Sequence, residues 1–252
     1  MALSFVSSTE VALGDPAAAM SVLADGRRLL TAEGPGDWRT GSLHLITVYI
    51  ANYAGDDDSA RAEVQQALAV ARRLGIPTLL ALALALQGHA HCNDNSQGAL
   101  AAIEEAIGLI EAGAGDSLYP MLLMDAAVLR TDAGDMAGAA RTLRTAVDHA
   151  VRTGDRTHVT DAVAVATFVL AGHPARLAAA ATLDAARHGP VLGPIPATFS
   201  AIHQTRIGTA REHVTSSLGP DAAAKARQLG AAMTYDEIIA YTLDQLSRIA
   251  AQ

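Results

Sequence analysis

A short turn sequence recurs about every 40 residues along this chain, and this repeat constrains the fold more than any other feature. Each copy lies between two stretches that favour helix. A fixed period of this length indicates stacked helical hairpins. The copies are GDPAAA at 14–19, GDDDSA at 55–60, DNSQGA at 94–99, GDMAGA at 134–139 and GHPARL at 172–177.

The composition favours a protein made of helices. Of the 252 residues, 50% are hydrophobic and only 4% are aromatic. Most of the hydrophobic residues are alanine and leucine, which favour helix, and alternating β-branched or aromatic residues are nearly absent. We therefore expect an all-α fold with a sizeable core.

Each turn separates a helix before it, the A helix, from a helix after it, the B helix. We expect about five such hairpins in residues 1–188, a connector rich in proline and glycine at 189–196, and capping helices in residues 197–252. The expected A helices are 3–13, 38–54, 77–92, 117–133 and 156–171. The expected B helices are 16–33, 56–75, 96–113, 136–154 and 174–189. The expected terminal helices are 197–218, 222–229 and 235–249.

Helix start and stop signals support these boundaries. Three aspartates at 56–58 suit the N-terminus of a B helix, as a cap and as charges that favour the helix dipole. Thr234, with Glu237 three residues later, predicts a capping box. Glycines stand where a helix end favours a left-handed residue: Gly75, Gly113, Gly154 and Gly189.

The B helices share a stripe of small, large and small residues. Spacings of four and three place each set on one helix face, where alanines permit close approach and the larger residue fills the gap between hairpins. This order resembles the tetratricopeptide repeat, which implies a right-handed α–α superhelix, or solenoid. The period exceeds the roughly 34 residues of that family, and the A helices lack its Trp and Tyr positions. The stripes are Ala60, Val64 and Ala67; Ala99, Ile103 and Ala106; and Ala139, Leu143 and Ala146.

The stretch at 218–243 carries the elements Leu-Gly at 218–219, Gly-Ala-Ala-Met at 230–233 and Asp-Glu-x-x-x-Tyr-x-Leu at 236–243. In these elements it resembles the end of the helical-repeat region in large actinobacterial ATP-dependent regulators. Those comprise LuxR-type and antibiotic-regulator-type transcription factors and multidomain class III adenylate cyclases. The resemblance implies a nucleotide-binding module upstream of the repeats and a catalytic or DNA-binding domain outside them.

This sequence lacks the catalytic parts of those regulators. It has no Gly-x-x-x-x-Gly-Lys-Ser/Thr loop to hold phosphate, and its only lysine, Lys225, lies near the C-terminus. Nine residues follow Leu243, too few for a helix-turn-helix. The sequence also opens without an N-terminal capping segment, so we expect Met1 to begin a fragment or a shortened relative of such a regulator.

Charge and cysteine content argue against several classes of protein. The net charge is −8, and no basic run is long enough for a nucleic-acid surface. The single cysteine, Cys92, cannot form an internal disulfide and suits a cytoplasmic protein. The N-terminus has no signal-peptide pattern, and the longest apolar run, 76–86, is too short to span a membrane.

No cluster of residues predicts a catalytic, cofactor or metal site. His89, His91 and Cys92 lack the further ligands that zinc requires, so we interpret them as residues at the end of a helix. The aspartates at 56–58 lack the alternating ligands and the glycine of a calcium loop. No Gly-x-Ser-x-Gly element is present to hold a nucleophile.

The predicted binding surface is the groove lined by the A helices, because these helices face the concave surface in tetratricopeptide-like arrays. Aromatic and amide side chains there suit a peptide or a small ligand. In the alternative interpretation, the tyrosines are core or rim aromatics. The six predicted groove residues are Tyr49, Asn52, Tyr53, His91, Thr131 and Asp132.

These observations predict a non-catalytic sensor module of a signalling or transcriptional regulator, which binds a protein, peptide or small molecule in the groove. An upstream ATPase module is the expected partner if the chain is part of a larger protein. No direct contact with nucleic acid or membrane is expected. Two alternatives remain open. One is a self-association scaffold, a homodimer formed through the Ala-rich faces or the last helix. The other is an all-α enzyme with an unrecognised site.

Overall fold

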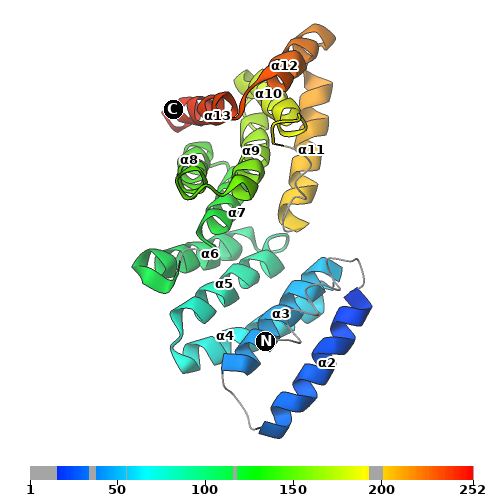
Figure 1. The fold of residues 1–252 in the computed structure, drawn as a ribbon, viewed down its shortest axis with the longest axis vertical. Coiled ribbons are helices and arrows are strands. Elements are labelled where there is room, and N and C mark those ends of the chain that lie inside the picture. Colours follow the sequence, from blue (N-terminus) through cyan, green and yellow to red (C-terminus); the bar gives the residue numbers. More distant parts are fainter. Residues whose placement is uncertain (1–15, 34–37, 55, 116–117, 193–200, 252) are drawn as a thin grey trace. The chain divides into compact units, whose positions relative to one another are not determined.

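The computed structural model describes residues 16–33, 38–54, 56–115, 118–192 and 201–251. Every regular element within those ranges is a helix (Figure 1), so the prediction of an all-α fold is confirmed. The expected first A helix at 3–13 and residues 193–196 of the expected connector lie outside the described residues. The chain forms two compact units, 1–116 and 117–252.

In the first unit, each helix packs on the helix that follows it, and the two A helices also pack on each other. Thus α3 contacts both its partner B helix α4 and the next A helix α5, and α4 also packs on α5. This arrangement is the one expected of adjacent helical hairpins. The helices are α2 (Pro16–Glu33), α3 (Trp38–Ala54), α4 (Asp57–Leu74), α5 (Pro77–His91) and α6 (Ser96–Leu109), which continues into a π-helical turn (Ile110–Ala114).

The second unit begins with the same hairpin packing. It contains α7 (Tyr119–Asp132), α8 (Met136–Thr153), α9 (Arg156–Ala171), a 3-10 turn (Pro174–Arg176) and α10 (Leu177–Arg187). Helix α8 packs between α7 and α9, and the A helices α7 and α9 also contact each other.

The terminal helices of this unit pack back on the hairpins in three different places. They are α11 (Ala201–Ser217), α12 (Pro220–Ala232) and α13 (Tyr235–Ala250). Helix α11 runs along α9, α12 packs on α10, and α13 returns to α8 (Figure 1). The end of the chain therefore covers both an A helix and two B helices.

The stripe predicted on the B helices is buried. Val64 on α4, Ile103 on α6 and Leu143 on α8 are each 0% exposed. The alanines on either side of them in the stripes are also buried. The backbone of α5 approaches Ile103 so closely that a Cβ on Gly88 would lie 2.6 Å from Ile103 Cγ1. The small and large residues therefore fit neighbouring helices together as the spacing predicted.

Most of the predicted helix ends are also confirmed. The side chain of Asp56 accepts a hydrogen bond from the backbone N–H of Ser59, and Asp57 and Asp58 lie in the first turn of α4. Thr234 and Glu237 form the expected capping box. Three of the four predicted glycines, Gly75, Gly113 and Gly154, have positive φ.

The prediction for Gly189 is wrong. Helix α10 ends at Arg187, and His188 follows with right-handed backbone angles. His188 Nδ1 lies 2.7 Å from the carbonyl oxygen of Asp184, to which the ring N–H donates. The His188 side chain therefore bonds a carbonyl at the end of the helix, a role that the backbone around a left-handed glycine usually fills.

Candidate functional site

The first unit holds four of the six predicted groove residues, and two of their side chains are described. Tyr49 on α3 is 50% exposed. His91, the last residue of α5, is partly buried, and its Nδ1 lies 3.5 Å from Asp94 Oδ1. The side chains of Asn52 and Tyr53 lie outside the described residues. Of the two described candidates in this unit, Tyr49 is therefore the more exposed.

The second unit holds the other two candidates, and both already have partners. The Thr131 hydroxyl donates to the carbonyl of Ala127, 2.8 Å away. Asp132 accepts from Nε of Arg206 on α11 at 2.6 Å. Helix α11 therefore contributes the partner of one predicted groove residue. Neither unit by itself brings all six candidates together.

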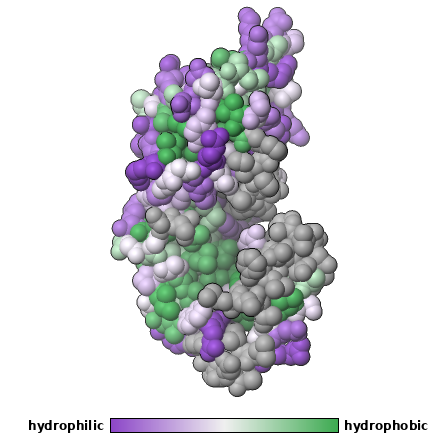
Figure 2. Space-filling view, viewed as in Figure 1, coloured by the Kyte–Doolittle hydropathy of each residue, from purple (hydrophilic) through white to green (hydrophobic). Residues whose placement is uncertain are grey.

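A hydrophobic area lies over α5 on the face of the first unit drawn in Figure 2. Leu79, Leu80 and Leu82 of α5 are only partly buried. Helix α5 packs against α3, the helix that carries Tyr49. A Cβ on Gly41 of α3 would lie 2.8 Å from Leu79 Cδ2, so the two A helices approach closely. Apolar and aromatic side chains are therefore available on adjacent A helices.

A polar cluster joins the first three described helices of this unit. Glu63 on α4 accepts from Arg27 of α2 at 2.5 Å and lies 2.6 Å from His44 Nδ1 of α3. Arg27 also donates to the hydroxyl of Thr47 at 3.1 Å. Burial alone would raise the pKa of Glu63, but hydrogen bonds from His44 and Arg27 outweigh it and hold the pKa below its ordinary value. The cluster therefore stabilises the ionised carboxylate.

We expect Glu63→Gln to lower the free energy of unfolding at pH 7 by about 1–3 kcal/mol, because it replaces the carboxylate that Arg27 and His44 contact by a neutral amide. The depressed pKa means that Glu63 stabilises the fold above its unfolded value, near 4.5, and that this contribution disappears as pH falls through the folded pKa. The difference between the two proteins should therefore shrink below about pH 4.5. Urea unfolding followed by circular dichroism at several pH values measures it. Glu105→Gln, at an exposed glutamate of α6, is the control, and an equal loss in both variants would contradict the role of the cluster.

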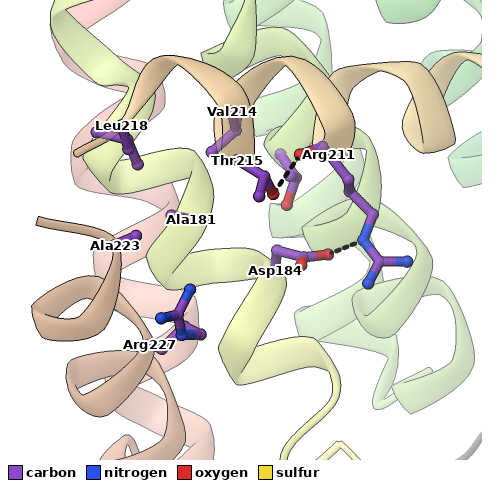
Figure 3. Close-up of a pocket in the computed structure, with 9 residues that line it drawn as sticks. Ala181, Asp184, Arg211, Val214, Thr215, Leu218, Ala223 and Arg227 are labelled. Carbon is purple, nitrogen blue, oxygen red and sulfur yellow. Dashed lines mark hydrogen bonds and ion pairs between the residues drawn. The ribbon is translucent and has the colours of Figure 1, made fainter. Parts of the chain in front are cut away.

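The second unit contains a cleft of about 100 Å³ where four helices meet. Its polar residues are Thr167 of α9, Asp184 of α10, Arg211 and Thr215 of α11, and Arg227 of α12. Arg211 Nε lies 2.9 Å from Asp184 Oδ1, which joins α11 to α10 (Figure 3). The apolar part of the lining consists of Ala181, Val214, Leu218 and Ala223.

The charges around this cleft are mainly those of arginine. Arg187 lies near Asp161 and Asp184; burial lowers its pKa, and the charges of these two aspartates oppose the shift without cancelling it. Arg227 forms no hydrogen bond or ion pair with any other described residue. The lining offers guanidinium donors together with a small apolar wall, while the hydroxyls of Thr167 and Thr215 already donate to carbonyls of their own helices. Such an arrangement suits recognition of a polar group.

The other chemically reactive residues of the described ranges form no metal site. Cys92 is buried, and within the described ranges no three His, Cys, Asp or Glu side chains gather closely enough to hold a metal ion. Two shifted carboxylates are explained by helix ends. Hydrogen bonds from Ser59 lower the pKa of Asp56, and burial opposes this. At the other helix end, Thr234 donates hydrogen bonds to Glu237 from its backbone N–H and its hydroxyl, and these lower the pKa of Glu237.

The cleft residues were not predicted from the sequence. They come from four helices and are far apart in the chain, so no local motif marks them. A search of protein-family models, curated proteins and solved structures finds no match to this chain. Among the described helices, none combines the length and the apolar character needed to cross a membrane.

Proposed function

We propose that this chain is a non-catalytic, tetratricopeptide-like module that binds a partner on its A helices. The B helices use their small–large–small stripes for packing between hairpins, so their buried faces are not available to a partner. The A helices α3 and α5 retain accessible apolar and aromatic side chains. An extended or helical peptide with apolar side chains is the ligand class that suits such a face.

The proposal depends above all on one observation: Tyr49 is half exposed on α3, a helix that packs on α5, where Leu79, Leu80 and Leu82 are only partly buried. Tyrosine is favoured at the centre of binding surfaces because it offers a large contact area and a hydroxyl at low entropic cost. The groove role of Tyr49 follows from the resemblance to tetratricopeptide-like arrays, and the exposure of its side chain supports that role.

We also propose that the module belongs to a cytoplasmic, ATP-dependent signalling or transcriptional regulator, in which the hairpins continue as a right-handed solenoid. The support is the similarity of residues 218–243 to the ending of the repeat region in those regulators. In this proposal, ligand binding favours one of two arrangements of the helices and so acts on a neighbouring ATPase module. Sequencing the genomic region upstream of Met1 tests the parentage, since an in-frame phosphate-binding loop would support it and an unrelated coding region would contradict it.

Selection of a displayed peptide library on the whole chain tests the binding role. We expect the selected peptides to bind the Tyr49→Ala variant about tenfold or more weakly, as is usual when a central aromatic contact is lost. Leu229→Ala removes a hydrophobic side chain of equal fractional exposure, 50%, from the second unit and should leave the affinity unchanged. Failure to select any peptide, or equal weakening by both substitutions, would argue against the A-helix surface. Fluorescence anisotropy with labelled peptides gives the affinities.

A further inference from the structure

We infer that the cleft between α9, α10, α11 and α12 binds a single oxyanion group, the carboxylate or phosphate of a small ligand. This site lies within the second unit and goes beyond the proposed binding of a peptide on the A helices of the first unit. The cleft's size, its charge and the helices that it joins support the inference.

The size of the cleft limits what can enter. A volume of about 100 Å³ has room for several water molecules. It is well below the roughly 300–1,000 Å³ of pockets that enclose whole drug-sized ligands. The cleft therefore accommodates one small group and not a nucleotide or an extended peptide.

The charge of the lining favours an anion. The lining contains one carboxylate, that of Asp184, and two guanidiniums, those of Arg211 and Arg227. Arg211 neutralises Asp184 through its Nε, which leaves its terminal nitrogens for another acceptor. Arg227 has no partner of its own among the described residues. The lining therefore has a net positive charge, whereas the whole chain has a net charge of −8.

The shape of the guanidinium group also suits an oxyanion. Its planar array of N–H groups matches the oxygens of a carboxylate or phosphate and forms two parallel hydrogen bonds with either. The Thr215 hydroxyl, which donates to the carbonyl of Arg211, lines the same cleft. Figure 3 shows Arg227 on α12 and the Asp184–Arg211 pair on either side of the lining.

The position of the cleft gives binding a structural consequence. Arg211 belongs to α11, which packs on α9 and α10, and Arg227 belongs to α12, which packs on α10. An oxyanion held by both arginines would link these helices to each other. The oxyanion shifts the protein toward the arrangement in which α11 and α12 are linked only if it binds that arrangement more tightly than the unlinked one. Occupancy should therefore slow the exchange of backbone amides in α11 and α12.

Titration of the whole chain with inorganic phosphate and, separately, with succinate tests the inference, at constant ionic strength and followed by amide NMR shifts. We expect saturable shifts in α11 and α12, and an affinity reduced about tenfold or more in Arg227→Gln, since a charged hydrogen-bond donor is lost. Lys225→Gln removes the same charge from an exposed position on the same helix and should bind like the unaltered chain. If only phosphate or only succinate gives saturable shifts, the result identifies the bound group as a phosphate or as a carboxylate.

Two results would overturn the inference: no saturable response to either anion, or equal weakening by Arg227→Gln and Lys225→Gln, which would indicate general charge attraction. Hydrogen exchange of the Arg227→Gln variant without anion verifies that it is folded. The Arg227→Lys variant keeps the charge but lacks the planar guanidinium, so it should recover only part of the affinity. The peptide selection on the first unit is independent of these titrations. Either the proposed function or this second site can therefore fail alone.

Discussion

Replacing Gly230 with alanine should destabilise the chain by about 3 kcal/mol, the upper part of the usual range for overpacking. A Cβ at this position would lie 2.1 Å from the carbonyl oxygen of Thr182 and 2.9 Å from the backbone nitrogen of Ala186. Both atoms belong to the backbone of α10, so no side chain can rotate away to make room. Helix α12 would have to move off α10, and its buried small residues would lose their contacts.

Gly208 provides the matched control for this substitution. It lies within α11 and a Cβ there would meet no atom within 4 Å. Because glycine weakens a helix interior, Gly208→Ala should stabilise the chain by up to about 1 kcal/mol. Urea unfolding of both variants gives the free energies, and hydrogen exchange shows whether the loss is confined to α10 and α12. A stabilised Gly230→Ala variant would contradict the close approach of these helices.

Truncating Leu143 to alanine should cost about 3–5 kcal/mol, the range for a fully buried leucine whose surroundings collapse poorly. Leu143 is 0% exposed on α8, and its stripe neighbours Ala139 and Ala146 are too small to fill the vacated space. Helix α8 packs on α7, α9 and α13, so the cavity would loosen both the hairpins and the last helix.

The control lies on the same helix. Val151 is 40% exposed, and Val151→Ala should change the free energy of unfolding by no more than about 0.5 kcal/mol. Thermal and urea unfolding of the two variants distinguish a packing role for the stripe from a general effect of shortening side chains on α8. Similar losses in both would show that the small–large–small order is not what holds the hairpins together.

Local signals in the sequence predicted the helices well, because each helix is largely determined by neighbouring residues. The predicted helices 38–54 and 156–171 coincide with α3 and α9. The capping box at Thr234 and Glu237 was also recognisable, since both partners lie within one turn. The end of α10 was not recognisable, because a hydrogen bond from the His188 side chain closes the helix where a left-handed glycine was expected.

The candidate site was less predictable, because its contacts join helices that are far apart in the chain. Of the six groove residues proposed from the repeat, Tyr49 is half exposed, whereas Asp132 is paired with Arg206 on α11. The repeat describes only hairpins that continue one after another. It holds no information on how the terminal helices pack against them.

The sequence by itself therefore determined the helical class, the boundaries of most described helices and the buried stripes, because these follow from spacing and capping along a single helix. Only the tertiary structure decided that α11 supplies a partner for Asp132, and that Arg211 and Arg227 line one cleft with Asp184. These contacts join residues far apart in the chain. Their geometry depends on how small residues such as Gly230 let whole helices approach, and no local pattern records that.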